Sequence, residues 1–169
     1  GSGSTILASG GSHTLSGAYQ YLRSGRTLRN DGQLVVGATT NDVKLYMDGS
    51  NGGIAKTRLV NQGEMVFQGS KNTYIYQNSG NPDAELENNG KLIKRDSGYT
   101  QINTRVSNTN QILVDGGVLN LGGNVVNSGS LQVGNGATLQ FAGSSSHSAT
   151  ASLSNGAGMV VLSGGTHSF

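Results

Sequence analysis

Residues 105–133 read RVSNTNQILVDGGVLNLGGNVVNSGSLQV, and this stretch decides the fold. Apolar residues recur in it in pairs at a spacing of two, which is the period of a strand with one buried face. Glycine-rich triplets separate the pairs, and residues that tolerate a positive φ end each strand in a turn. Asn108 and Asn127 occupy matching places 19 residues apart, so the stretch predicts a strand-turn unit that repeats like the coils of a solenoid. The pairs are Ile112 and Val114, Leu119 and Leu121, and Leu131 and Val133.

The same turn recurs along most of the chain. Its form is apolar-x-Asn-x-Gly-x-apolar-x-apolar, and Asn110 and Ala157 replace the glycine in two of the six matches. Lys94 stands at the last apolar place of a third match. Successive asparagines are 31, 27, 20, 19 and 28 residues apart, so the turn is strict while the length of the connecting segments varies. The six asparagines are Asn30, Asn61, Asn88, Asn108, Asn127 and Asn155.

A strict turn with variable loops predicts an all-β chain with almost no α-helix, folded as a parallel β-solenoid of about six or more coils. Coils of this kind stack about 4.8 Å apart. The six asparagines are then expected to form a ladder of hydrogen-bonded amides along the stack. A β-sandwich is the alternative, but its antiparallel hairpins would not keep one Asn-x-Gly signature. The residues predicted to point inward are Leu28, Leu34, Leu59, Met65, Leu86, Leu92 and Ile112.

The chain of 169 residues is long enough for one domain with a real core. We interpret residues 1–4 as a possible expression scar and residues 5–169 as a single β-solenoid domain. Residues 10–24 fit either a cap or a further coil. The long asparagine intervals place extra residues in three segments, of which the first two are rich in turn signals and are predicted to protrude. These segments are 38–56, 68–84 and 142–150, and Val43 to Met47 and Tyr74 to Tyr76 are candidate strands within them.

Composition excludes several classes of protein. Glycine accounts for 28 residues and proline for one, a mixture rich in turns but unlike proline-rich disordered linkers. The sequence has no cysteine, which excludes disulfides, and no apolar run approaches the roughly 20 residues of a membrane-spanning helix. A net charge of +2 is too small to indicate a nucleic-acid partner. Every Lys, Arg, Asp and Glu lies at or before Asp115, so we expect the uncharged last third to stack on neighbouring coils.

Two segments carry a family resemblance. The segment from Val114 to Gly123, VDGGVLNLGG, and that from Gly134 to Phe141, GNGATLQF, resemble the passenger repeats of bacterial autotransporter adhesins and other large bacterial surface adhesins. The resemblance is clearest over residues 86–165. It implies a right-handed parallel β-helix, exported to the outer cell surface, that works in adhesion, self-association, biofilm formation or as a spacer. Residues 5–169 are then expected to be a fragment of a longer surface protein. Such families share no catalytic residues, so the resemblance implies neither an active site nor a cofactor.

Aromatic and basic residues near the amino end are the best candidates for ligand contact. Arg23, Arg26 and Arg29 cluster, and guanidinium groups suit the carboxylates or sulfates of acidic glycans, although a polar cap over the first coil is the alternative. Tyrosines at a spacing of two share a strand face and can stack on sugar rings, but half-buried strand tyrosines need no ligand. We predict contact with a host or bacterial surface glycan or protein, or with a second copy, through Tyr19, Tyr21, Arg23, Arg26, Tyr74 and Tyr76.

Acidic residues and histidines are weaker candidates for a functional site. Asp83, Glu85 and Glu87 alternate, so a strand places their carboxylates on one face, either as a Ca²⁺ or acid/base site or as a solvated outer face. The histidines His13, His147 and His167 lack metal-ligand spacing. The segment from Asp48 to Gly53 begins like a calcium loop, but Leu59 occupies its twelfth place and excludes an EF-hand. No metal is therefore expected.

We expect a non-catalytic structural or adhesive module of a bacterial cell-surface protein, located outside the cell, with no cofactor, no nucleic-acid partner and no membrane insertion of this segment. The alternative is a β-helical protein that binds or cleaves polysaccharides, like a lyase or a tailspike. Its chemistry would depend on Asp83, Glu85 and Glu87 with nearby Lys91. Ice binding is disfavoured because no Thr-x-Thr occurs, and a trimeric fibre is a further alternative.

Overall fold

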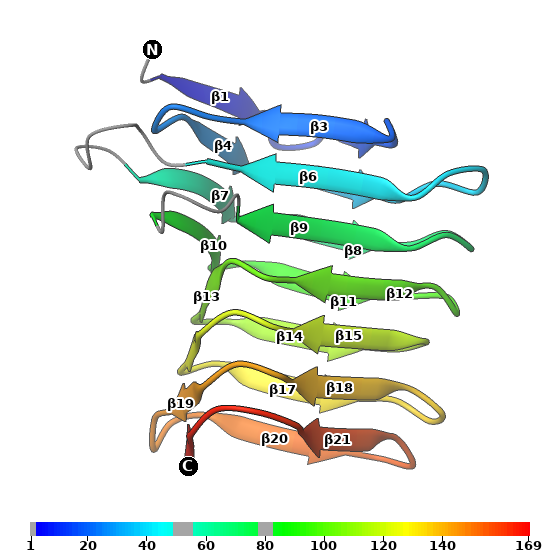
Figure 1. Ribbon diagram of the computed structural model, residues 1–169, viewed down its shortest axis with the longest axis vertical. Helices are drawn as coiled ribbons and strands as arrows, with labels where there is room; N and C mark the ends of the chain where they lie inside the picture. The colour runs from blue at the N-terminus through cyan, green and yellow to red at the C-terminus, as the bar shows by residue number, and fades with distance from the viewer. Residues whose placement is uncertain (1–2, 49–55, 78–82) are drawn as a thin grey trace.

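The computed structural model describes residues 3–48, 56–77 and 83–169. These residues contain 22 strands and no helix, and all paired strands are parallel. The chain winds through three sheets in turn, so that each coil contributes one strand to each sheet (Figure 1). As the chain descends in Figure 1, the front strands run to the left and those behind run to the right, which makes the winding right-handed. The predicted parallel β-helix is confirmed, and the described residues form seven complete coils and one strand of an eighth.

The three sheets are named here in the order in which the chain visits them. The first sheet contains β1 (Ser4–Leu7), β4 (Thr27–Asn30), β7 (Thr57–Asn61), β10 (Ala84–Asn88), β13 (Arg105–Asn108), β16 (Val125–Asn127), β19 (Ser145–His147) and β22 (His167–Ser168). The second contains β2 (Ser12–Leu15), β5 (Gln33–Val36), β8 (Glu64–Phe67), β11 (Lys91–Lys94), β14 (Gln111–Val114), β17 (Ser130–Val133) and β20 (Ser152–Asn155). The third contains β3 (Tyr19–Leu22), β6 (Val43–Met47), β9 (Thr73–Gln77), β12 (Tyr99–Ile102), β15 (Val118–Leu121), β18 (Thr138–Phe141) and β21 (Met159–Leu162).

One core runs the length of the rod. Strand residues alternate between this core and the outside, and in-register pairing brings inward residues of successive coils into columns. Leu28, Leu59 and Leu86 form such a column in the first sheet. All seven residues predicted to point inward lie in the core. Leu28 is only partly buried, because the first coil alone covers it at the N-terminal end of the rod. The stacking of apolar residues thus drives coil formation.

An asparagine ladder marks the corner between the first and second sheets. The side-chain Nδ2 of each asparagine donates to Oδ1 of the asparagine in the next coil, at 2.8, 2.7, 2.6 and 2.6 Å. In the first three rungs Nδ2 also donates to a backbone carbonyl of the next coil, at 2.9 to 3.0 Å. The ladder prediction is confirmed for Asn30, Asn61, Asn88, Asn108 and Asn127, which are all buried.

The prediction for Asn155 is wrong. Asn155 ends β20 in the second sheet, pairs with Val133 and is exposed. His147 takes the sixth place in the column, because it pairs with Asn127 and lies 20 residues after it, one coil length. Asn127 Nδ2 lies 3.2 Å from His147 Nδ1. The 28-residue interval therefore spans one whole coil and part of the next.

Several irregular segments belong to the regular coils. Residues 10–24 supply β2 and β3, so they form a coil and not a cap. The two candidate strands of the long segments are confirmed as β6 and β9, and both lie within the third sheet. Most of the two predicted protruding turns, at 48–53 and 78–83, lies outside the described residues. Ser4 opens β1 and the Gly3 carbonyl accepts from Thr27 N at 2.9 Å, so the end of the segment interpreted as a scar takes part in the first coil.

Candidate functional site

All six tyrosines of the chain lie on the outer face of the third sheet, over its first four strands. Tyr21, Tyr46 and Tyr76 form one column, because β3, β6 and β9 pair in register at these positions. Tyr19 and Tyr74 lie in the neighbouring column, on either side of Lys44. Tyr99 opens the fourth strand of the sheet. We call this group of six tyrosines the tyrosine face.

The rings of the tyrosine face touch one another in a continuous series. The centroid of Tyr46 lies 5.4 Å from that of Tyr21 and 5.5 Å from that of Tyr76. Tyr74 lies 5.4 Å from Tyr76 and 6.3 Å from Tyr99. Such aromatic pairs add about 0.5–1.5 kcal/mol each beyond burial. Neighbouring rings thus hold each other in place on the sheet.

Burial raises the pKa of the Tyr76 phenol, and the neighbouring tyrosines and Asp42 raise it further. Burial also raises the pKa of Tyr99, against a smaller opposing effect of a hydrogen bond with Asn120. Both hydroxyls therefore keep their protons at neutral pH and can donate hydrogen bonds. These two side chains are therefore uncharged.

Two cations lie against the most exposed rings. The guanidinium carbon of Arg23 lies 4.1 Å from the centroid of Tyr21, and the same side chain forms an ion pair with Asp48, with Nε 3.0 Å from Oδ2. The ammonium of Lys44 lies 5.4 Å from the centroid of Tyr19. Tyr19 and Tyr21 are 61% and 55% exposed, the highest values among the tyrosines. The accessible aromatic surface is thus concentrated in the first coil, beside two cationic side chains.

A hollow of about 240 Å³ opens beside Tyr19. It lies where the chain turns from β5 into β6, at the edge of the tyrosine face. The carboxylate of Asp42 is oriented by the next coil, because its Oδ1 accepts a hydrogen bond from Asn72 N at 3.1 Å. The lining residues are Ala18, Tyr19, Asn41, Asp42 and Lys44, which bring an aromatic ring, an amide, a carboxylate and an ammonium group together.

The structure divides the predicted arginine cluster. Arg23 joins the tyrosine face, whereas Arg26 lies exposed in the turn between β3 and β4. Arg29 lies on the outer face of the first sheet, where its ion pair with Asp31, 2.6 Å long, raises the pKa of the guanidinium. Sequence reasoning missed Tyr46, Tyr99, Lys44 and Asp48. The strand register of the third sheet would have identified them, but this register can be predicted only when the length of each coil is known.

The alternating carboxylates lie elsewhere, on the first sheet. Glu85 pairs with Arg105 at 3.3 Å and with Lys56 at 3.8 Å, and Glu87 pairs with Arg58 at 3.3 Å. The partners come from the coils before and after β10, so the ion pairs connect neighbouring coils. Within the described ranges no group of three His, Asp or Glu side chains is placed to hold a metal ion. Glu85 and Glu87 therefore connect neighbouring coils through ion pairs.

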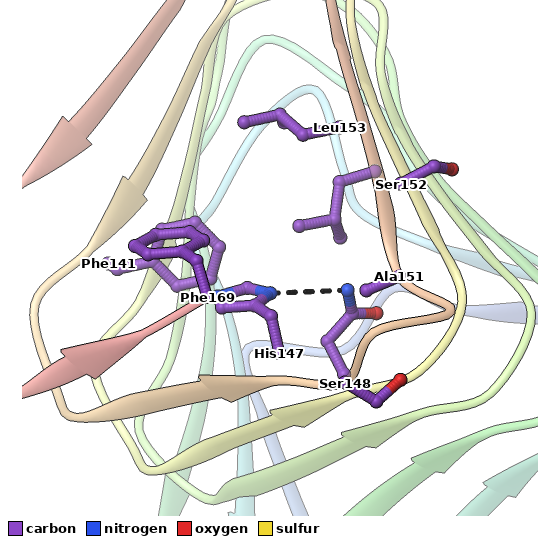
Figure 2. A pocket seen from close by; sticks show the side chains of 9 residues that line it. Phe141, His147, Ser148, Ala151, Ser152, Leu153 and Phe169 are labelled. Atoms are coloured by element: carbon purple, nitrogen blue, oxygen red, sulfur yellow. Dashed lines mark hydrogen bonds between the residues drawn. The ribbon is translucent and has the colours of Figure 1, made fainter.

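A second hollow, of about 90 Å³, lies where the last coils leave the core open (Figure 2). His147 lies in it with its ring stacked on Phe169, with centroids 4.6 Å apart, while Phe141 meets it edge-on at 5.4 Å. Its Nε2 lies 3.1 Å from Ser145 Oγ, which lies 2.8 Å from His167 Nδ1. Burial lowers the pKa of His147, and the charge of His167 lowers it further. Because Asn127 donates to Nδ1, the neutral ring carries its proton on Nε2.

Comparison of the chain with protein-family models, with curated proteins and with solved structures gave no match. Over the part of the chain that the structure describes, no helix is long and apolar enough to cross a bilayer. The tyrosine face and the hollow beside Tyr19 are therefore the candidate functional site.

Proposed function

We propose that this β-helix is a structural and adhesive module of a bacterial cell-surface protein, and that the tyrosine face is its contact surface. The observation that carries this proposal is the gathering of all six tyrosines on one outer face. The outer face of a solenoid needs only to be soluble, and tyrosines contribute nothing to the core from there. Tyrosine and arginine are among the residues enriched at recognition surfaces, so the gathering of the tyrosines beside Arg23 favours binding.

The rod suits this role mechanically. Parallel coils satisfy the backbone hydrogen bonds along the axis and hold the outer side chains on a rigid support. Tyrosine has few rotatable bonds, and neighbouring rings restrain it further, so little conformational entropy is lost on binding. A flat surface of weak contacts gains strength when many copies bind together, as they do between two cells.

The expected partners are a host or bacterial surface glycan or protein, or a second copy of the chain. The extracellular location is part of the proposal and is supported by the resemblance of residues 86–165 to adhesin passengers. The ion pairs of Glu85 and Glu87 favour a structural role for these carboxylates over polysaccharide cleavage, because an acid/base pair needs carboxylates that are free to exchange protons.

The test is adhesion of cells or beads that display the chain. We expect a triple variant, Tyr21→Ser, Tyr46→Ser and Tyr76→Ser, to lose at least tenfold in adhesion and clumping. The matched control changes three outward residues of the second sheet, Gln33→Ser, Gln111→Ser and Gln132→Ser, and keeps adhesion. Because Tyr46 and Tyr76 are half-buried, circular dichroism checks folding, and Tyr21→Ser alone repeats the test at an exposed ring. Equal adhesion of the folded triple variant and the control would contradict the proposal.

A further inference from the structure

We infer that the hollow beside Tyr19 is a subsite for one neutral pyranose ring of a glycan. The inference rests on the proposed function, because it names the ligand class of the tyrosine face. Three properties of the hollow carry it: an exposed aromatic ring, a set of polar groups of complementary kinds, and a balance of charge.

The aromatic ring of Tyr19 is the most exposed of the six, and it borders the hollow. Its nearest ring neighbour, Tyr46, is 6.5 Å away, a longer separation than between the other stacked rings. A pyranose presents a patch of C–H groups on one face, and this patch loses contact with water when it lies on an aromatic ring. Tyr19 is therefore placed to receive the apolar face of a sugar.

The polar groups of the hollow match the hydroxyls at the rim of such a sugar. Asn41 offers both a donor and an acceptor, Asp42 offers acceptors and Lys44 offers donors. A sugar hydroxyl donates one hydrogen bond and accepts others, so a mixed set of this kind pairs with neighbouring hydroxyls. The backbone of Asn72 holds Asp42 in place before a ligand arrives, which reduces the entropy lost on binding.

Charge decides between sugar classes. Asp42 and Lys44 place one negative and one positive group in the same hollow, and Arg23 nearby is neutralised by Asp48. An acidic sugar would be attracted by Lys44 but repelled by the Asp42 carboxylate. An amino sugar would be attracted by Asp42 but repelled by Lys44. A neutral pyranose meets neither penalty.

Size limits the subsite to one ring. The volume of about 240 Å³ is below the roughly 300–1,000 Å³ of pockets that enclose drug-sized ligands. The rest of a glycan chain would continue over Tyr21 and Tyr46, whose rings follow in the next column.

The experiment measures binding of neutral and acidic oligosaccharides to the whole chain. The neutral probes are hexamers of glucose, mannose and galactose, and the acidic probes are oligogalacturonate and chondroitin sulfate. We expect at least one neutral hexamer to bind, with little dependence on ionic strength. Tyr19→Ala should weaken it at least tenfold and Asp42→Asn at least threefold, whereas Tyr19→Phe keeps binding. The matched control is Met159→Ala, which removes a residue 54% exposed at the far end of the same sheet.

Two results would overturn the subsite while leaving the proposed function standing. One is neutral-hexamer binding that survives Tyr19→Ala but is lost in the triple tyrosine variant. The other is adhesion through the tyrosine face to a protein or an acidic glycan, without binding of any neutral hexamer. Absence of both adhesion and glycan binding would overturn both proposals together.

Discussion

Each buried asparagine of the ladder is useful because its amide both donates and accepts along the rod axis. Asn88, for example, accepts from Asn61 and donates to Asn108 Oδ1 and to the Gln111 carbonyl. No other side chain of similar size offers two donors and an acceptor in one plane. Among the described residues, the buried Asn30 Oδ1 has no hydrogen-bond donor, because Leu7 occupies the column before it.

The first prediction concerns Asn88→Leu. This change removes one rung and leaves a donor of Asn61, the Oδ1 of Asn108 and a backbone carbonyl without partners in the core. Each unpaired buried group costs about 1–3 kcal/mol, so we expect a loss of about 3 kcal/mol or more in unfolding free energy. Urea unfolding followed by circular dichroism measures it. Asn155→Leu, at an exposed asparagine with the same neighbouring sequence pattern, should change stability by less than about 0.5 kcal/mol.

The sequence predicted five of the six ladder positions because the turn keeps an asparagine there, followed in four of the five by a glycine two residues later. The prediction for the sixth position is wrong because a histidine ring can also accept the last amide hydrogen bond. A pattern that requires asparagine does not detect this histidine. The 20-residue spacing from Asn127 to His147 is the signal that identifies the position. The tyrosine pairs were recognised by their spacing of two, but their union with Tyr46 and Tyr99 depends on coil lengths that loops obscure.

A second prediction follows from His147, whose folded-state pKa lies below the ordinary value. Protonation would place a hydrogen on Nδ1, facing the amide hydrogens of Asn127. The unfolded chain takes up this proton near pH 6.5, so stability is full above that pH and falls as pH decreases below it. Among the described residues, His167 is the one whose charge lowers the pKa of His147 further, and no Asp or Glu follows Asp115 in the sequence.

The measurement compares urea midpoints at pH 7.5 and pH 5 for the natural chain and His147→Asn. The asparagine keeps an acceptor for Asn127 but cannot be protonated. We therefore expect a smaller drop in midpoint for the variant than for the natural chain. An equal drop would show that the ladder does not carry the pH dependence.

At the scale of elements, the corner glycines are explained by close approach between coils. Gly63 and Gly90 do not have a positive φ. A Cβ atom at either position would lie 2.1 Å from the carbonyl oxygen of the corner glycine in the preceding coil. The expectation that glycine serves a positive φ in these turns is thus wrong at these corners. The recurrence of the glycine was predictable, but its cause depends on stacking between coils, which one turn does not reveal.

The corner between the second and third sheets is stabilised in a different way. Asp96 adopts a positive φ of 61°, and the buried Lys94 donates from Nζ to the carbonyls of Arg95 and Asp96, the latter at 2.8 Å. Burial lowers the pKa of this ammonium, and the charge of Asp96 partly restores it. A lysine at an inward position therefore serves the turn that follows the strand.

A third prediction tests the close approach. Gly63→Ala forces its Cβ against a backbone oxygen that cannot move without separating two coils, so we expect a loss of about 2 kcal/mol or more in stability. Gly156→Ala is the matched control, because its Cβ would meet its nearest neighbour, the Val133 carbonyl oxygen, at an ordinary 3.6 Å. Thermal unfolding of the two variants compares them. Similar melting temperatures would mean that the corners adjust more easily than the stacked backbones indicate.

For the whole molecule, the important property is that each coil contacts mainly its two neighbours. Stability is then close to a sum of coils and their interfaces. The coil made by β14, β15 and β16 has no insertion, and its inward residues match those before and after it. Such a coil is removable in principle.

The fourth prediction is that deletion of residues 109–127, one full repeat, leaves a folded rod. Strand β17 would then stack on β11, and β18 on β12, with every inward column kept. We expect an unchanged β-type circular dichroism spectrum, a modestly lower melting temperature and a rod about 4.8 Å shorter by small-angle scattering. Deletion of residues 109–118, about half a repeat, moves side chains to the wrong sheets and should unfold the later coils. Equal damage by both deletions would contradict the modular view.

The ladder also gives the molecule an electric dipole along its axis. All its amides donate toward the carboxyl end, so their small dipoles add along the axis instead of cancelling. For protein engineering, the two ends are therefore not interchangeable. A grafted coil placed before Asn30 must offer a hydrogen to its unpaired oxygen, whereas one placed after the last rung must offer a lone pair. Chimeras assembled in the same direction can continue this chain of dipoles, and a reversed module would oppose it.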